Sequence, residues 1–196
     1  MEKTATSHRG HFTMLAPPAS PPVLTALVSS AFALTLALPN ARTVTKTPAG
    51  PGPVGIADSI VIEKRAHRLT LFHMGRPLRT YLVALGAGGV DKDKVSAGDR
   101  RTPEGLFSVE ARNPFSHYHL ALRLSYPDVR HRTIAQQLGV SPGGDIMIHG
   151  LPNGRHAVGA FHRTKDWTNG CIALTDEEIE EIWSAVPVGT PVEIKA

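Results

Sequence analysis

Short runs in which apolar and polar residues alternate make up much of the chain after residue 58. Such alternation is typical of β-strands that bury one face, and the Gly- and Pro-containing segments between the runs predict turns. The expected strands are 59–63, 68–72, 79–85, 106–110, 119–124 and 191–194. The first three are close enough in sequence to form an antiparallel meander. The pattern therefore predicts a mainly β domain.

A first helix is predicted between residues 128 and 138. Val129, Ile134, Ala135 and Leu138 recur there at near-helical spacing, and Gly139 stands where a helix would end.

A second helix is predicted after Thr175, whose hydroxyl can accept from the amide of Glu178 while the Glu178 carboxylate reaches back. This helix must end before Pro187. Its apolar face consists of Ile179, Ile182 and Trp183. With the strands, the two helices predict an α+β fold that is mainly β.

Residues 1–57 differ from the rest of the chain. Residues 23–38 form a nearly unbroken apolar run, and residues 39–54 are rich in Pro, Gly, Thr and Ala. This layout is typical of an export signal or membrane anchor followed by a linker, although the apolar run packing on the domain is an alternative. We expect an exported protein of the periplasm or cell envelope, with residues 58–196 as its folded domain. Membrane contact is then expected only through an uncleaved N-terminal segment.

Composition narrows the possible partners. Charged residues make up 19% and hydrophobic residues 41% of the 196 residues, which fits one soluble domain. The formal net charge of +4 comes from scattered basic residues without interleaved aromatic residues. This distribution argues against nucleic acid as a partner, whereas an anionic polymer such as a cell wall is compatible with it.

Cys171 is the only cysteine, so it cannot form an intrachain disulfide. It stands between Gly170 and a short apolar run, where it is either a nucleophile or a small buried hydrophobe in a strand. A nucleophilic cysteine needs a base or positive charge nearby to favour its thiolate. Gly170 would leave backbone amides free for an oxyanion, and Thr168 and Asn169 can fix the turn by hydrogen bonding.

His149 is the best candidate for the base. It ends an apolar strand that begins at Asp145, and Gly150 allows a sharp turn after which the Gly150 carbonyl could orient the ring. An ion pair with this imidazole would let Cys171 react well below pH 8.5. A structural strand-end histidine is the alternative. His156 and His162 are expected in an exposed, mobile loop, from which His162 could contact substrate.

Three ordered motifs resemble those of the L,D-transpeptidase catalytic domain of the YkuD type. They are Thr102-Pro103-Glu104-Gly105-Leu106-Phe107, His149-Gly150 and Thr168-Asn169-Gly170-Cys171, and the resemblance covers about residues 58–194. It implies a β-sandwich-like domain with one or two helices. It also implies Cys171 as the nucleophile, His149 as general base and acid, the Gly150 carbonyl as the group that orients His149, and the amides of Gly170 and Cys171 as an oxyanion hole.

The implied reaction is attack on the diaminopimelate–D-alanine bond of peptidoglycan stem peptides, which gives an acyl-enzyme. An amine then produces a crosslink or an attached wall-linked protein, or water produces hydrolysis. Many family members have Arg where this chain has Ala173, so a substrate carboxylate would fall to Arg155 or Arg163. The motif around Cys171 also resembles a branch that includes hydrolases which release wall-bound proteins, so hydrolysis is an open alternative.

A hypothesis of another class is a non-catalytic zinc- or wall-binding module. In it, Cys171 and the histidines His149, His156 and His162 hold zinc, or the thiol is inert. Their spacings match no compact zinc knuckle, and the chain has no Cys-x-x-Cys arm. We therefore expect no metal and no cofactor.

Overall fold

The computed structural model describes residues 54–196. The signal or anchor expected near the N-terminus lies outside the described residues, as does nearly all of the expected linker. The elements in chain order are β1 (Ser59–Glu63), β2 (Arg68–His73), β3 (Arg76–Leu82), β4 (Gly105–Ser116), β5 (His119–Leu124), α1 (Val129–Gln137), β6 (Met147–His149), the 3-10 helix η1 (His156–Thr164), β7 (Ile172–Ala173), α2 (Asp176–Ala185) and β8 (Pro191–Lys195).

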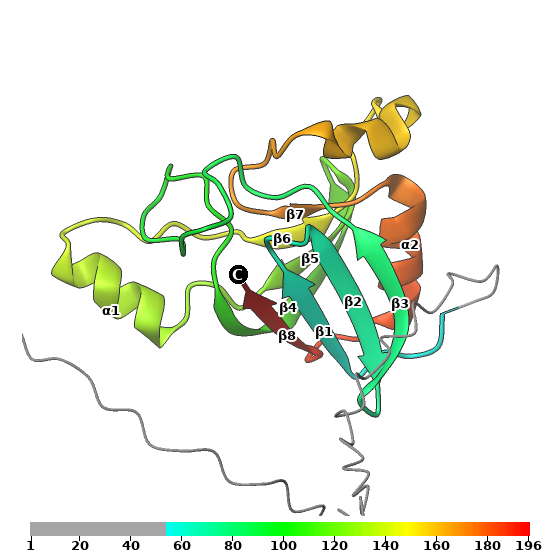
Figure 1. Cartoon of the computed structure of the whole chain (residues 1–196), viewed down its shortest axis with the longest axis horizontal. Coiled ribbons are helices and arrows are strands. Elements are labelled where there is room, and N and C mark those ends of the chain that lie inside the picture. The colour runs from blue at the N-terminus through cyan, green and yellow to red at the C-terminus, as the bar shows by residue number, and fades with distance from the viewer. Residues whose placement is uncertain (1–53) are drawn as a thin grey trace, which may run out of the picture. The chain divides into compact units, whose positions relative to one another are not determined.

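Eight strands form one mixed sheet in the order β3-β2-β1-β8-β4-β5-β6-β7 (Figure 1). The expected meander is confirmed, because β1, β2 and β3 pair antiparallel with Ile60 opposite Leu71 and Ile62 opposite Leu69. β3 begins earlier than expected and contains Pro77. Its place at the end of the strand order makes a proline there tolerable.

The C-terminal strand takes a central position that alternation alone does not reveal. β8 lies between β1 and β4, parallel to β1 and antiparallel to β4. At the other end of the order, β6 and β7 are parallel. The segment that leaves β3 returns to β7, since the backbones of Ala84 and Ala173 exchange hydrogen bonds of 3.0 and 2.8 Å. The sheet is therefore curled so that its two ends meet.

β4 is longer than the expected 106–110 and runs on into a hairpin with β5. Residues 110–115 are exposed, so their side chains give no alternating signal. They belong to the strand because their backbone pairs with β5, as at Asn113 opposite Ala121. The hairpin brings Tyr118, at its tip, close to the end of β6, where the amide of Gly150 donates to the Tyr118 carbonyl at 3.1 Å.

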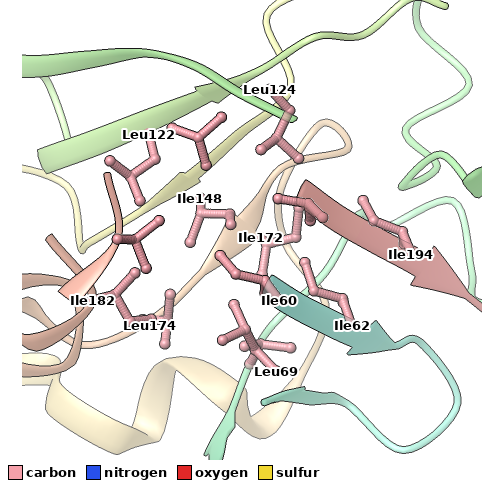
Figure 2. Packing of buried hydrophobic residues seen from close by; sticks show 14 of the residues in the cluster. Ile60, Ile62, Leu69, Leu122, Leu124, Ile148, Ile172, Leu174, Ile182 and Ile194 are labelled. Carbon is pink, nitrogen blue, oxygen red and sulfur yellow. The ribbon is translucent and has the colours of Figure 1, made fainter. Parts of the chain in front are cut away.

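The core is built from aliphatic side chains that meet between the strands and α2. Figure 2 shows Ile60 and Leu69 from the meander pointing toward Ile148 and Ile172 from β6 and β7, with Ile182 of α2 beside them. All of these side chains are fully buried or nearly so. The buried faces of β6 and β7 thus fix the strand that ends in the candidate base and the strand that follows the candidate nucleophile.

α2 has the expected capping box. The Thr175 hydroxyl accepts from the Glu178 amide at 3.3 Å, and the Glu178 carboxylate accepts from the Thr175 amide at 3.0 Å. Ile179 and Ile182 are buried as predicted, whereas Trp183 is only partly buried and its ring lies 4.1 Å from the Arg112 guanidinium carbon.

α1 forms where expected, although of the four apolar residues that predicted it only Ala135 is fully buried. Val129 and Leu138 are exposed, and the buried residues are Ala135 and His131. The His131 ring lies between two carboxylates, with Nδ1 at 2.6 Å from Asp128 and Nε2 at 3.3 Å from Asp93. Although burial opposes it, hydrogen bonding to these carboxylates raises the pKa of His131. The hydrogen bonds of His131 to these carboxylates, together with the burial of Ala135, therefore hold α1 to the domain.

The mainly β, α+β fold expected from the sequence is confirmed, with two α-helices and η1 around the sheet. Within residues 54–196, no helix combines the length and apolar character needed to cross a membrane.

Candidate active site

The candidate base ends β6, and the candidate nucleophile immediately precedes β7, which pairs with β6 in parallel. The register places Ile148 beside Ile172 and His149 beside Ala173, so Cys171 immediately precedes β7 next to Met147. Ile148 and Ile172 both point into the core. Because side chains alternate along a strand, His149 and Cys171 point to the opposite face. The fold thus brings together residues that are 22 positions apart in sequence.

His149 is held in one orientation and in one tautomer. Its Nδ1 lies 2.7 Å from the Gly150 carbonyl oxygen, a contact that the sequence predicted. A carbonyl only accepts, so Nδ1 carries the hydrogen and Nε2 keeps the lone pair. The ring is packed against Tyr118 and Trp167, with ring centroids 4.5 and 5.8 Å away. His149 is therefore oriented to accept a proton at Nε2.

Burial sets the charge of His149. The residue is 3% exposed, and desolvation lowers the pKa of its imidazole to about 4, although the bond to Gly150 works in the opposite direction. The ring is consequently neutral at neutral pH. A neutral imidazole is the form that acts as a general base.

Cys171 is partly buried and carries a neutral thiol. Burial raises the pKa of this thiol, outweighing a backbone hydrogen bond from Met147 that lowers it. The Sγ atom lies 3.4 Å from the Asp145 carbonyl oxygen, and no hydrogen bond joins Cys171 and His149 among the residues that the structure describes. The sequence-based expectation of a thiolate–imidazolium pair was wrong for this state, because desolvation disfavours both charges.

The turn before Cys171 depends on Thr168 and Gly170. The buried Thr168 hydroxyl donates to the Cys171 carbonyl at 2.7 Å and accepts from the Gly170 amide at 3.1 Å. Gly170 has a φ of +128°, and a Cβ there would lie 2.7 Å from the Arg101 carbonyl oxygen. Only glycine fits this position. Asn169, expected to help fix the turn, is exposed to solvent.

This turn changes the expected set of oxyanion donors. The Gly170 amide is already bonded to Thr168. The Cys171 amide has no acceptor anywhere in residues 54–196. A free amide next to the candidate nucleophile is available to stabilise an oxyanion.

A loop that is hydrogen-bonded to Asp99 packs against this turn. Asp99 accepts hydrogen bonds from the Lys94 ammonium at 2.7 Å and from the amides of Val95, Ser96 and Arg101 at 2.7, 3.1 and 3.0 Å. Burial would raise the pKa of Asp99, but these donors lower it to about 2. The Asp99 carboxylate thus fixes the backbone of Arg101, whose carbonyl packs against Gly170.

The remaining sequence-based candidates lie in or near η1. His162 was expected in an exposed, mobile loop, but it is 7% exposed and packs against Trp167. Burial, followed by the charge of Arg163, lowers the pKa of His162 to about 4. Arg163 forms an ion pair with Glu178 of the capping box. Arg155 is exposed at a cavity that His162 also lines, and His156 is exposed outside it.

Two aromatic residues near His149 were given no role from the sequence. Trp167, close to the cysteine motif, contacts the rings of both His149 and His162. Tyr118 is 39% exposed and lies against the rings of His149 and Trp167. Trp167 could have been suspected from its position four residues before Cys171. Tyr118 is brought to His149 by the β4–β5 hairpin, and no sequence motif marks it.

The part of the chain that the structure describes contains no group of three or more His, Cys, Asp or Glu side chains placed to hold a metal ion.

Comparison with known proteins identifies a family and individual proteins that are similar to this chain. A protein-family model described as the L,D-transpeptidase catalytic domain (YkuD) matches residues 57–194. The Bacillus subtilis (strain 168) protein YqjB, provisionally named an L,D-transpeptidase, is 28% identical over 150 residues, which cover 74% of this chain and 75% of YqjB.

Solved structures are similar in fold. The helical cell shape determining protein Pgp2 from Campylobacter jejuni has a TM-score of 0.54 at 24% identity, over 73% of this chain and 50% of Pgp2. An L,D-transpeptidase from Xylanimonas cellulosilytica has a TM-score of 0.49 at 17% identity, over 76% of this chain and 64% of that one. The chain spans about half the length of Pgp2. Since the family model covers most of the chain and ends at β8, this protein belongs to the L,D-transpeptidase catalytic domain (YkuD) family.

Proposed function

We propose that the protein is a cysteine acyltransferase that acts on peptidoglycan stem peptides through an acyl-enzyme. The observation that carries this proposal is the pairing of β6 with β7, which puts His149 and Cys171 on one face while Gly150 holds the His149 tautomer. Membership of the L,D-transpeptidase family supports the choice of substrate. A protein with this substrate works outside the cytoplasmic membrane, so we propose an exported or cell-envelope location.

The first step starts from two neutral groups. As the substrate binds, the Cys171 thiol leaves the Asp145 carbonyl and attacks the carbonyl carbon of the diaminopimelate–D-alanine bond. His149 accepts the thiol proton at Nε2 during the attack, so that no free thiolate has to form in a desolvated site. The oxyanion accepts a hydrogen bond from the Cys171 amide.

The second step releases the leaving group. The C–N bond breaks, the proton on His149 passes to the departing D-alanine amine, and a thioester joins the acyl group to Cys171. An incoming amine then attacks the thioester after His149 removes its proton. The thiol leaves with a proton and the new amide is a crosslink. Water in place of the amine gives hydrolysis, so the acceptor decides between the two products.

The test is incubation of the full chain with defined muropeptides, followed by mass spectrometry of the products. We expect an acyl-enzyme mass on wild-type protein, with crosslinked or hydrolysed peptides that differ in mass. Cys171→Ala should give neither, because it removes the nucleophile but little packing. Turnover by a folded Cys171→Ala protein above the background of heat-denatured enzyme would refute the proposal.

A further inference from the structure

A cavity of about 320 Å³ lies beside the catalytic histidine, and the mechanism above leaves it unused. Its wall begins with Leu151, two residues after His149, and includes Trp167, whose ring contacts the His149 ring. The apolar part of the lining consists of Leu151, Pro152, Val158, Phe161 and Trp167. Such a wall suits a chain of methylene groups.

The polar part of the lining is positive. Arg155 and Lys165 are exposed cations, and no Asp or Glu is among the lining residues. The remaining polar side chains are His162 and Thr164. The charge of this cavity is therefore complementary to an anion.

His162 contributes a buried donor that lacks an acceptor. The indole N–H of Trp167 points to Nδ1 of His162 at 3.5 Å, and an indole N–H can only donate. In the neutral ring the hydrogen is thus on Nε2. That atom is buried and has no partner among residues 54–196. Because leaving a buried donor unpaired is costly, a bound acceptor would recover free energy at this point.

Arg163, the neighbour of His162, has a different role. Its guanidinium pairs with Glu178, which also closes the capping box of α2. Arg163 therefore links η1 to α2 and holds His162 in the cavity wall. Arg155 and Lys165 remain exposed to solvent.

We propose that this cavity is the subsite for an aliphatic, carboxylate-bearing arm of the acyl donor. The Nε2–H of His162 donates to the carboxylate, Arg155 and Lys165 supply positive charge, and the apolar wall packs on the methylene groups. The inference rests on the proposed function, since the side arm of diaminopimelate in a stem peptide has this chemistry. It assigns His162 to substrate recognition rather than to the chemical step.

Isothermal titration calorimetry tests the subsite with two synthetic stem tetrapeptides. One has the free carboxylate on the diaminopimelate arm, and the other has it as the primary amide. In the Cys171→Ala full chain, which binds without turnover, the free acid should bind about 10-fold more tightly than the amide. The ratio should fall several-fold in Cys171→Ala/His162→Phe, where a ring of similar size still packs on Trp167 but cannot donate, while Arg155 and Lys165 still favour the acid.

Two further variants keep the test decisive. His156→Phe alters an exposed histidine of η1 outside the cavity and should leave the ratio near 10. Arg155→Gln changes only an exposed side chain and should lower the ratio several-fold, so a misfolded His162→Phe protein would not end the test. Circular dichroism checks that each variant is folded.

The outcomes separate the subsite from the function. Equal binding of acid and amide, or a ratio unchanged by both His162→Phe and Arg155→Gln, would overturn the subsite, while turnover of either peptide by wild-type protein would leave the proposed function standing. Absence of both binding and turnover would overturn the two together. A ratio lowered several-fold by His162→Phe and kept in His156→Phe is the expected result.

Discussion

Acidification should destabilise the domain through its buried histidines, and His149 allows the effect to be calculated. Burial holds the pKa of His149 at about 4, against an ordinary value of 6.5. Between these values the unfolded chain binds a proton that the folded protein excludes, so stability is present above pH 6.5 and is lost as the pH falls toward 4. The whole difference is worth about 3 kcal/mol, of which about 2 kcal/mol is lost between pH 7 and pH 5.

Urea unfolding at several pH values, followed by tryptophan fluorescence, measures this loss. Wild-type protein includes the contribution of His149 and a second one from His162, which is held neutral in the same way. His149→Phe keeps a ring against Tyr118 and Trp167 but cannot titrate. Between pH 7 and pH 5, the free energy of unfolding should therefore decrease in both proteins, and the decrease should be about 2 kcal/mol smaller in His149→Phe than in wild type.

The control is His156→Phe, in which an exposed histidine of η1 is replaced, and its pH dependence should follow that of wild type. Comparing slopes removes the constant cost of the hydrogen bond that His149→Phe loses to Gly150. Equal pH dependence in wild type and His149→Phe would refute the conclusion that the buried imidazole is neutral in the folded protein.

Two other predictions follow from the cysteine and its turn. The rate of Cys171 alkylation by iodoacetamide should rise with pH to a midpoint above the value of about 8.5 for an ordinary thiol, because burial raises its pKa; a midpoint below that value would restore the thiolate–imidazolium pair. Gly170→Ala should lower the free energy of unfolding by about 2 kcal/mol and abolish turnover, since its Cβ would meet the Arg101 carbonyl at a positive φ. Wild-type stability and activity in this variant would show that the turn tolerates a side chain.

Local chemistry in the sequence was enough to predict several parts of the structure. Alternation gave the meander, because a strand with one buried face must alternate. Thr175 and Glu178 gave the start of α2, because a capping box is satisfied within four residues. The bond from His149 to the Gly150 carbonyl was predictable for the same reason, since it joins adjacent residues.

Features that depend on contacts between distant segments came only from the tertiary structure. The central place of β8 and the length of β4 are set by backbone pairing, which is independent of side-chain pattern. His131 of α1 is buried against Asp93, which comes from a distant loop, and no local pattern in the sequence predicts this contact.

The same division applies to the site. Cys171 and His149 could be proposed from the sequence as nucleophile and base, since nucleophilic chemistry requires those residue types in a recognisable setting. Their protonation could not, because the aromatic rings around His149 come partly from the β4–β5 hairpin and the depth of burial determines each pKa. The unpaired Nε2 of His162 likewise exists only once η1 folds against Trp167. The sequence thus determined which reactive groups the protein has. Tertiary packing decided their charge and the shape of the cavity beside them, because desolvation and cavity shape depend on residues that are far apart in the chain.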